Sequence, residues 1–196
     1  MSNSEFSRRE ALRTIALAVA AGGMATSAEA QHVHEMAAAE KFASGGVYKP
    51  KLFNDHEYAT LKHLCELTIP GANQGGAPEF IDLLASHNSE LATIFTGGLG
   101  WLDDESRRRY KATFRDAKPE EQTAILDLIA YRRNAHQEGL GHGIRFFDWV
   151  RRMTADAYYT SPVGIKEIGY KGNTAVAKFE VPQEAIDYAL KRSGLG

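Results

Sequence analysis

The stretch that decides the fold is residues 144–159, with the sequence IRFFDWVRRMTADAYY. Its apolar residues recur at three- and four-residue steps, the spacing that places side chains on one side of an α-helix. One face carries Phe146, Trp149, Met153 and Ala157, and the neighbouring face carries Phe147, Val150 and Tyr158. A helix that is apolar over two faces is either a central core helix wrapped by others, or a helix with one side in the core and the other against a partner.

The part of the chain before this stretch predicts several shorter helices. Asn54 precedes Glu57 by three residues, a spacing typical of a capping box at a helix start, and Pro70 ends that helix. Pro78 suits a first helical position. The short apolar helix behind it carries Phe80, Ile81, Leu83 and Leu84.

Glycines and acidic residues divide the next part of the chain. We expect a helix capped by Ser89 to be interrupted by the glycines of residues 97–100 (GGLG), because glycine has a low helix propensity. The run DDE at residues 103–105 would then open a fresh helix, since acidic side chains favour the positive end of the helix dipole. Residues 118–121 (KPEE) would open another.

The pattern becomes irregular after residue 159, where Pro162 and several glycines follow. Alternation of apolar residues over 176–181 allows one short extended stretch, and a last helix is expected over residues 183–192. No internal repeat and no change of composition marks a second domain. The sequence therefore predicts an all-α fold, a single compact multi-helix domain with long loops over residues 52–196.

The first thirty residues are typical of a bacterial export signal. Arg8 and Arg9 precede a moderately apolar run over residues 14–26. This run is short for a membrane anchor, which needs about 20 apolar residues. Paired arginines at this place are typical of the twin-arginine route, which carries proteins across the membrane already folded. We therefore expect a periplasmic location.

Small residues follow the apolar run at the place where a signal peptidase would cut. Ala28 and Ala30 have the small side chains that such a peptidase accepts, so we expect cleavage before Gln31. Residues 31–51 are polar and alanine-rich, and we expect them to form a flexible, extended lead into the domain.

Length, charge and cysteine content limit the classes of function. Removing the first 30 of the 196 residues leaves 166, enough for one domain with its own core. The removed part holds three basic and three acidic residues, so the net charge of -2 is unchanged and favours neither nucleic acid nor an anionic membrane as a partner. Cys65 is the only cysteine, which excludes an internal disulfide and a thiolate metal cluster.

Sequence motifs that carry chemistry are missing. The glycine run at residues 139–143 (GLGHG) lacks the Gly-x-Gly-x-x-Gly spacing of a dinucleotide site. The seven histidines show no ligand spacing, and there is no His-Glu-x-x-His, Gly-x-Ser-x-Gly or haem-attachment motif. We therefore expect no catalytic, cofactor-binding or metal-binding residue in this chain.

Several short stretches, taken in order from Leu52 to Asn173, resemble one family. They are FNDHEYATL (53–61), LTIP (67–70), APEFID (77–82), GLGWLD (98–103), FFDW (146–149), YYTSP (158–162) and GYKGN (169–173). Together they make the chain similar to the small subunit, subunit 3 or gamma, of gluconate 2-dehydrogenase-type flavoprotein complexes. Relatives of this family include the small subunits of periplasmic glucose and glucoside 3-dehydrogenases. The twin-arginine signal is itself a trait of the family.

The resemblance implies an accessory role. In such complexes a large FAD-bearing subunit of the glucose–methanol–choline oxidoreductase class oxidises a sugar or sugar acid and passes electrons to a cytochrome c subunit or another acceptor. The small subunit carries the export signal, and the large subunit crosses with it. The resemblance thus implies a non-catalytic subunit that exports and stabilises a flavoprotein and meets the membrane only through the complex.

Aromatic residues among glycines near residues 158–173 indicate where the partner would bind, because exposed aromatics on irregular loops are typical of interfaces. We expect the interface at Phe147, Trp149, Tyr158, Tyr159, Tyr170 and Asn173. Two other interpretations remain open at this point. One is a transient periplasmic chaperone for flavin loading of the dehydrogenase, and the other is an autonomous enzyme or metal-binding protein.

Overall fold

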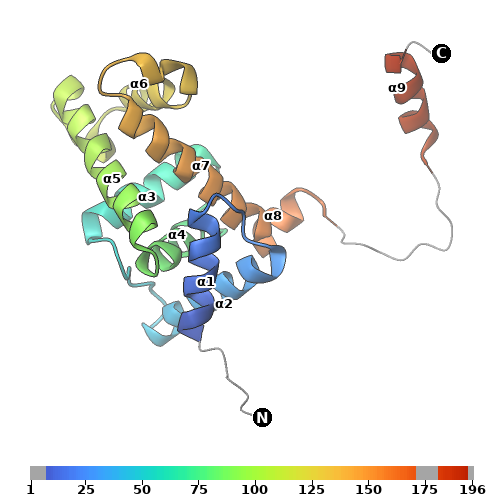
Figure 1. Ribbon diagram of the computed structural model, residues 1–196, viewed down its shortest axis with the longest axis horizontal. Coiled ribbons are helices and arrows are strands. Elements are labelled where there is room, and N and C mark those ends of the chain that lie inside the picture. Colours follow the sequence, from blue (N-terminus) through green and yellow to red (C-terminus); the bar gives the residue numbers. More distant parts are fainter. Residues whose placement is uncertain (1–7, 171–180, 194–196) are drawn as a thin grey trace.

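The computed structural model describes residues 8–170 and 181–193, and all regular structure in them is helical (Figure 1). The α-helices are α1 (Arg8–Ala20), α2 (Ser27–Ala43), α3 (Asp55–Thr68), α4 (Ala77–Ser86), α5 (Ser89–Tyr110), α6 (Pro119–Ile129), α7 (Gly141–Thr160), α8 (Pro162–Glu167) and α9 (Gln183–Ser193). Two 3-10 helices, η1 (Phe114–Asp116) and η2 (Arg132–His136), flank α6. The predicted all-α fold is confirmed. Within the described residues, no helix has the length and apolar content that a membrane span requires.

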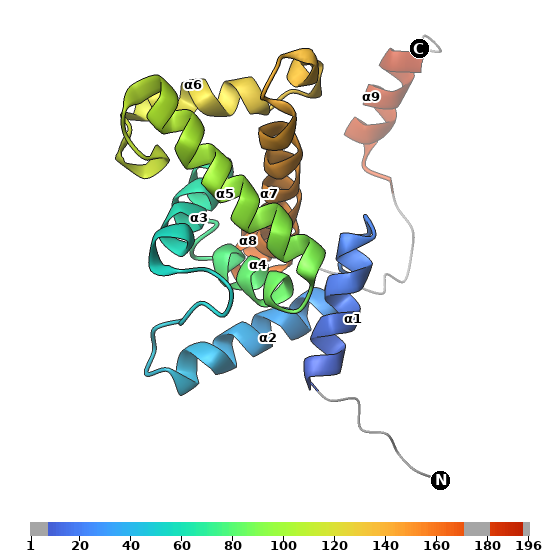
Figure 2. The same cartoon turned by 60° about the vertical axis from the view of Figure 1, so that its left-hand side comes forward.

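Helix α7, the stretch that decides the fold, lies at the centre of the domain. It contacts α2, α3, α4, α5, α6 and α8, and Figure 2 shows it running from α6 at one end of the domain towards α4 and α8 at the other. Both of its predicted apolar faces are buried, at Phe146, Phe147, Val150, Met153, Ala157 and Tyr158. Of the two interpretations of this helix, the central core helix is therefore correct for most of its length.

Helix α5 runs without a break through the glycines of residues 97–100, so the expected interruption is wrong. A Cβ built on Gly98 would lie 2.1 Å from ring atoms of Phe146 on α7, so the glycine permits close contact between the two helices. Gly143 of α7 provides the matching contact, because a Cβ there would lie 2.3 Å from the Trp101 ring of α5. Packing of the two helices outweighs the low helix propensity of glycine, about 1 kcal/mol per residue.

The acidic run at 103–105 lies inside α5 and not at the start of a new helix, and the cap of α5 is Asn88 rather than Ser89. Asp103 is buried and accepts hydrogen bonds from the backbone N–H of Phe114 at 2.9 Å and from Nε2 of His56 at 2.5 Å. A buried carboxylate with such partners joins α3, α5 and η1. Asp103 thus holds α3 and η1 against α5. Its place in the acidic run of the sequence did not indicate this structural role.

The predicted start of α3 is confirmed. Oδ1 of Asn54 accepts the backbone N–H of Glu57 at 2.9 Å, and the Glu57 carboxylate accepts the N–H of Asn54 at 3.0 Å. The chain enters this helix through residues 48–53, which are held by Asp82 of α4. That carboxylate is completely buried and accepts the Tyr48 hydroxyl at 2.7 Å and the N–H groups of Lys51 and Leu52 at 2.7 and 3.0 Å.

The prediction of a flexible, extended lead over residues 31–51 is wrong, because most of this segment belongs to α2. Thr26 and Glu29 form a capping box at its start, and Ala30, Val33 and Ala37 are buried on its inner side. His34 rests against the Phe80 ring, and its Nε2 lies 3.0 Å from the carbonyl oxygen of Ala157 on α7. Contacts with α4 and α7, distant in sequence, stabilise this helix.

Beyond α7 the chain is more regular than expected up to residue 167. The hydroxyl of Ser161 caps α8 by accepting the N–H of Gly164 at 3.1 Å, where the sequence predicted only irregular chain. The expected last helix is confirmed as α9, which has no buried residue and lies apart from the other helices (Figure 1). The short extended stretch expected over 176–181 falls almost entirely outside the described residues.

The buried carboxylate of Asp82 gives a test of the packing. We expect Asp82→Ala to lower the free energy of unfolding by about 3 kcal/mol, because it leaves the buried Tyr48 hydroxyl and the backbone N–H groups of Lys51, Leu52 and Phe53 without their acceptor. Chemical denaturation monitored by circular dichroism measures this loss. Asp127→Ala on the exposed side of α6 is the control and should change stability by less than about 0.5 kcal/mol. Equal losses in the two variants would contradict the assigned role.

Candidate partner-binding surface

The predicted interface residues separate into buried and exposed groups. Phe147 and Tyr158 are only 8% and 4% exposed, so in this structure they belong to the core. Tyr159 and Tyr170 are 44% and 60% exposed. Asn173 lies outside the described residues.

Tyr158 is buried because two glycines far away in the sequence make room for it. A Cβ built on Gly75 would lie 2.7 Å from the Tyr158 ring, and one on Gly71 would lie 3.2 Å from its hydroxyl oxygen. The hydroxyl donates a hydrogen bond to the Glu167 carboxylate, which raises the pKa of the phenol to about 12. Tyr158 therefore fixes α8 and the loop before α4, and it positions the neighbouring Tyr159 at the surface.

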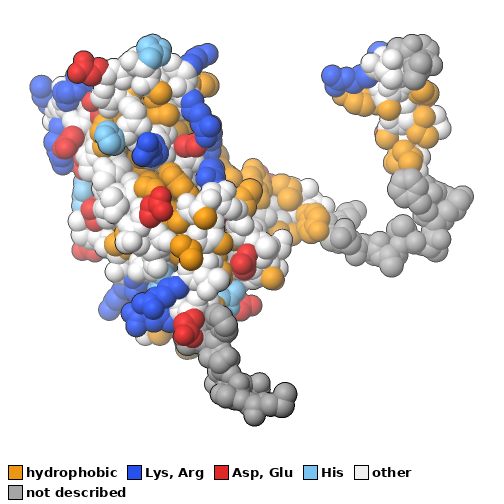
Figure 3. Space-filling view, in the orientation of Figure 1, with side chains coloured by type: hydrophobic (Ala, Val, Ile, Leu, Met, Phe, Trp, Pro, Cys, Tyr) orange, Lys and Arg blue, Asp and Glu red, His pale blue; other side chains and the backbone are white. Residues whose placement is uncertain are grey.

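An apolar patch forms where α7 and α8 meet. The patch consists of Tyr159, Val163, Ile168 and Tyr170, all of them exposed, and we call it the α8 patch. Figure 3 shows apolar side chains gathered on the part of the domain that projects at α8. Gly169 has φ +65°, a left-handed conformation that ends the helical path after α8. Tyr170 follows this turn and is exposed. Exposed apolar patches of this kind mark sites of protein contact.

Trp149 lies on another side of α7 and is half-buried. The guanidinium carbon of Arg152 lies 4.7 Å from the centroid of its ring, within the range of a cation–π contact. The same guanidinium donates to the carbonyl oxygens of Gly22 and Gly23 at 3.1 and 3.2 Å. Trp149 is thus next to a contact that joins α7 to the turn between α1 and α2.

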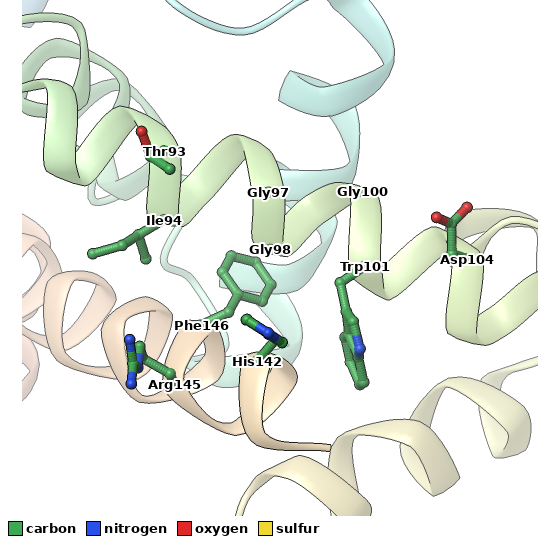
Figure 4. A pocket seen from close by; sticks show the side chains of 10 residues that line it. All are labelled: Thr93, Ile94, Gly97, Gly98, Gly100, Trp101, Asp104, His142, Arg145 and Phe146. Atoms are coloured by element: carbon green, nitrogen blue, oxygen red, sulfur yellow. The ribbon is translucent and has the colours of Figure 1, made fainter. Parts of the chain in front are cut away.

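A pocket of about 660 Å³ lies between α5 and α7, and the sequence did not indicate it (Figure 4). The Phe146 ring and the side chains of Ile94 and Trp101 give it apolar walls, and His142 and Arg145 stand at its α7 side. The backbone of α5 is bare there, since a Cβ on Gly97 or Gly100 would meet no atom within 4 Å. A concave apolar site with charged groups beside it can accept a side chain of another protein.

Titratable groups in the domain are arranged mainly to support the fold. Within the described chain, no group of three or more histidines, cysteines or acidic residues is placed to hold a metal ion. Cys65 is completely buried, and this burial raises the pKa of its thiol to about 12. Glu105 accepts both Arg108 and Arg109, and the hydrogen bonds from Arg108 contribute most to lowering the pKa of its carboxyl.

Comparison with known families gives one result over most of the domain. Residues 55–177 match the family described as Gluconate 2-dehydrogenase subunit 3. The chain belongs to this family. Searches of curated proteins and of solved structures gave no significant match. The match includes α3 to α8, so the α5–α7 pocket and the described residues of the α8 patch are in the family domain, whereas α1, α2 and α9 are outside it.

Membership of the subunit 3 family makes the protein an accessory subunit of a dehydrogenase complex, with a dehydrogenase as its partner. This confirms the resemblance found in the sequence. Within the described part of the family domain, the α8 patch and the α5–α7 pocket are surface features suited to protein contact.

The glycines of the pocket give a matched pair of substitutions. We expect Gly97→Ala to raise the free energy of unfolding of the isolated protein by about 1 kcal/mol, because alanine favours the helix and its Cβ meets open space. Gly98→Ala should lower it, because its Cβ would collide with the Phe146 ring. Thermal and urea unfolding measure both changes. Destabilisation of similar size by both variants would show that Gly97 also makes an internal contact.

Proposed function

We propose that this subunit 3 protein is the non-catalytic small subunit of a periplasmic FAD-dependent dehydrogenase complex that oxidises a sugar or sugar acid. It exports the flavoprotein subunit and stabilises it. The family match over residues 55–177 carries the proposal, since it makes the chain an accessory subunit of a dehydrogenase complex. The finer points rest on the N-terminal sequence and on the exposed surface.

The export role is supported by Arg8 and Arg9, which begin α1 and precede an apolar segment. We propose that this pair directs the chain to the twin-arginine route. A route for folded proteins suits a partner that must fold around its flavin before it crosses the membrane. The signal would then be cut between Ala30 and Gln31, after the small residues Ala28 and Ala30.

We propose that the chemistry of the complex takes place in the partner. The large subunit would be a flavoprotein of the glucose–methanol–choline class that holds FAD, and a cytochrome c subunit or another acceptor would take the electrons. The small subunit would supply a rigid helical surface, with Tyr159 and Tyr170 as aromatic contacts at one end of α7 and Trp149 on its side. Aromatic side chains supply much of the energy in protein interfaces, which suits a stabilising role.

A substitution of the arginine pair tests the export role. In cells that produce both subunits, Arg8→Lys combined with Arg9→Lys should leave the dehydrogenase activity in the cytoplasm. The periplasmic activity should fall to that of cells without the small subunit, because the flavoprotein would have no signal of its own. Arg13→Lys, in the same segment but outside the pair, is the control. Normal periplasmic activity in the double variant would overturn the export role.

The α8 patch gives a test of the partner role. We expect Tyr159→Asp and Tyr170→Asp each to weaken binding of the large subunit by roughly tenfold or more, because each removes an aromatic contact and adds a charge. Titration of the large subunit with each variant measures the dissociation constant, and affinity chromatography followed by gel filtration measures the stoichiometry of the complex. Tyr131→Asp, at another exposed tyrosine, is the control. Unchanged binding in both patch variants would contradict this interface.

The same chromatography separates a permanent subunit from a transient chaperone. A permanent subunit should elute with the active flavoprotein at a fixed ratio. A small subunit that is absent from the active enzyme would support the chaperone interpretation instead.

A further inference from the structure

The N-terminal segment that the proposed function assigns to export is packed against the folded domain. Helix α1 contacts α4 and α5, and Figure 2 shows it beside α2 and α4. Leu12, Ile15, Ala16 and Val19 on its inner side are all 5% exposed or less, whereas Leu17 on its outer side is 65% exposed. The apolar side of this segment is therefore part of the hydrophobic core.

The turn after α1 is shaped to bring the segment back onto the domain. Gly22 has φ +92°, a left-handed conformation that glycine adopts without strain at the end of a helix. A Cβ on Gly23 would lie 2.8 Å from the carbonyl oxygen of Ala18, so this position also requires glycine. The two glycines that interrupt the apolar run in the sequence thus end α1 and allow α2 to begin at Ser27.

Two side chains of α7 hold this turn in place. Nη2 of Arg152 donates to the carbonyl oxygens of Gly22 and Gly23, and Oδ2 of Asp156 accepts the N–H of Ala25 at 3.2 Å. We call Arg152 and Asp156 the α7 clamp. Asp156 is buried, and burial raises the pKa of its carboxyl from the ordinary value. The clamp connects residues that are about 130 positions apart in the sequence.

We propose that the folded domain binds its own export segment, residues 8–26, on α4, α5 and the α7 clamp, and that this segment serves in export only after it is released. The export step rests on the proposed function. One set of side chains, Leu12, Ile15 and Val19, cannot be packed in the core and be bound by a translocation system at the same time. The two states therefore compete, and the clamp sets the balance between them.

The proposed cleavage site is also inaccessible in the folded domain. The bond between Ala30 and Gln31 lies inside α2, and Ala30 is completely buried. Proteases cut exposed and flexible chain far more readily than packed helices. Cleavage there needs the first turn of α2 to open, and the capping box of Thr26 and Glu29 opposes that opening.

Hydrogen exchange of the purified full chain tests the docking directly. In the wild-type protein, the amides of residues 12–20 should exchange more slowly than those of α9, which has no buried residue. Arg152→Ala should speed exchange in residues 12–20 by roughly tenfold, because two hydrogen bonds to the turn are lost. Arg151→Ala is the control. It removes the same charge from the preceding residue, whose guanidinium donates to Asp148 and not to the turn, and it should leave exchange in residues 12–20 unchanged.

A second clamp variant guards against an indirect effect of Arg152 on Trp149. Asp156→Ala should open α1 in the same way, whereas Asp156→Asn keeps an oxygen that can accept the Ala25 N–H and should behave more like the wild type. Exchange in α3 and α6, which are not part of the surface that α1 is proposed to bind, reports whether each variant remains folded. Exchange in residues 12–20 that is as fast in the wild type as in Arg152→Ala and Asp156→Ala would overturn the docking.

Export measured in cells without the large subunit tests the consequence. Arg152→Ala should raise the amount of the small subunit in the periplasm several-fold over both the wild type and Arg151→Ala. No increase, in a variant whose α1 exchanges faster, would overturn the claim that docking limits export. Failure of the proposed function itself is recognised separately, because export would then persist when Arg8→Lys and Arg9→Lys are added to any of these variants.

Discussion

The fold depends on two places where an aromatic ring fills the space of a missing Cβ between α5 and α7. Phe146 of α7 lies against Gly98 of α5, and Trp101 of α5 lies against Gly143 of α7. Because each helix contributes one ring and one glycine, the two pairs fix both the separation of the helices and their relative position along the axis. Helices α3, α4 and α6 each contact both α5 and α7, so they pack around this pair.

This constraint explains which parts of the fold could be predicted from the sequence. The capping box of Asn54 and Glu57 and the apolar faces of α7 are local patterns, and both were predicted correctly. The course of α5 was not, because the role of Gly98 depends on a ring 48 positions later in the chain. Helix α2 was missed although its local signals were present, since Thr26 and Glu29 form a capping box and its sequence is rich in alanine, the strongest helix former. Its contacts with α4 and α7 add support from distant parts of the chain.

The exposure of surface side chains also depends partly on local sequence and partly on contacts with distant residues. Tyr158 and Tyr159 are neighbours on α7 and look alike in the sequence, yet one is buried and the other is exposed. Tyr158 lies on an inward face of α7, and Gly71 and Gly75, more than 80 positions away, leave the space that its ring fills. Arg152 gives a further case, since its guanidinium contacts both the Trp149 ring and the turn after α1. A partner that covered Trp149 would therefore act on a residue that also holds the N-terminal segment, which links the two roles proposed for this subunit.

The single cysteine has a consequence of its own. Cys65 is completely covered, the Thr154 hydroxyl donates to its sulfur at 3.4 Å, and the pKa of its thiol is raised by burial. The reactive form of a cysteine is the accessible thiolate, and the closed domain offers neither access nor ionisation. A chain that folds before it meets an oxidising compartment keeps this thiol reduced, whereas a chain that folds afterwards exposes it to oxidation first. The oxidation state of the Cys65 sulfur therefore distinguishes a domain that folded before it reached the oxidising compartment from one that folded afterwards.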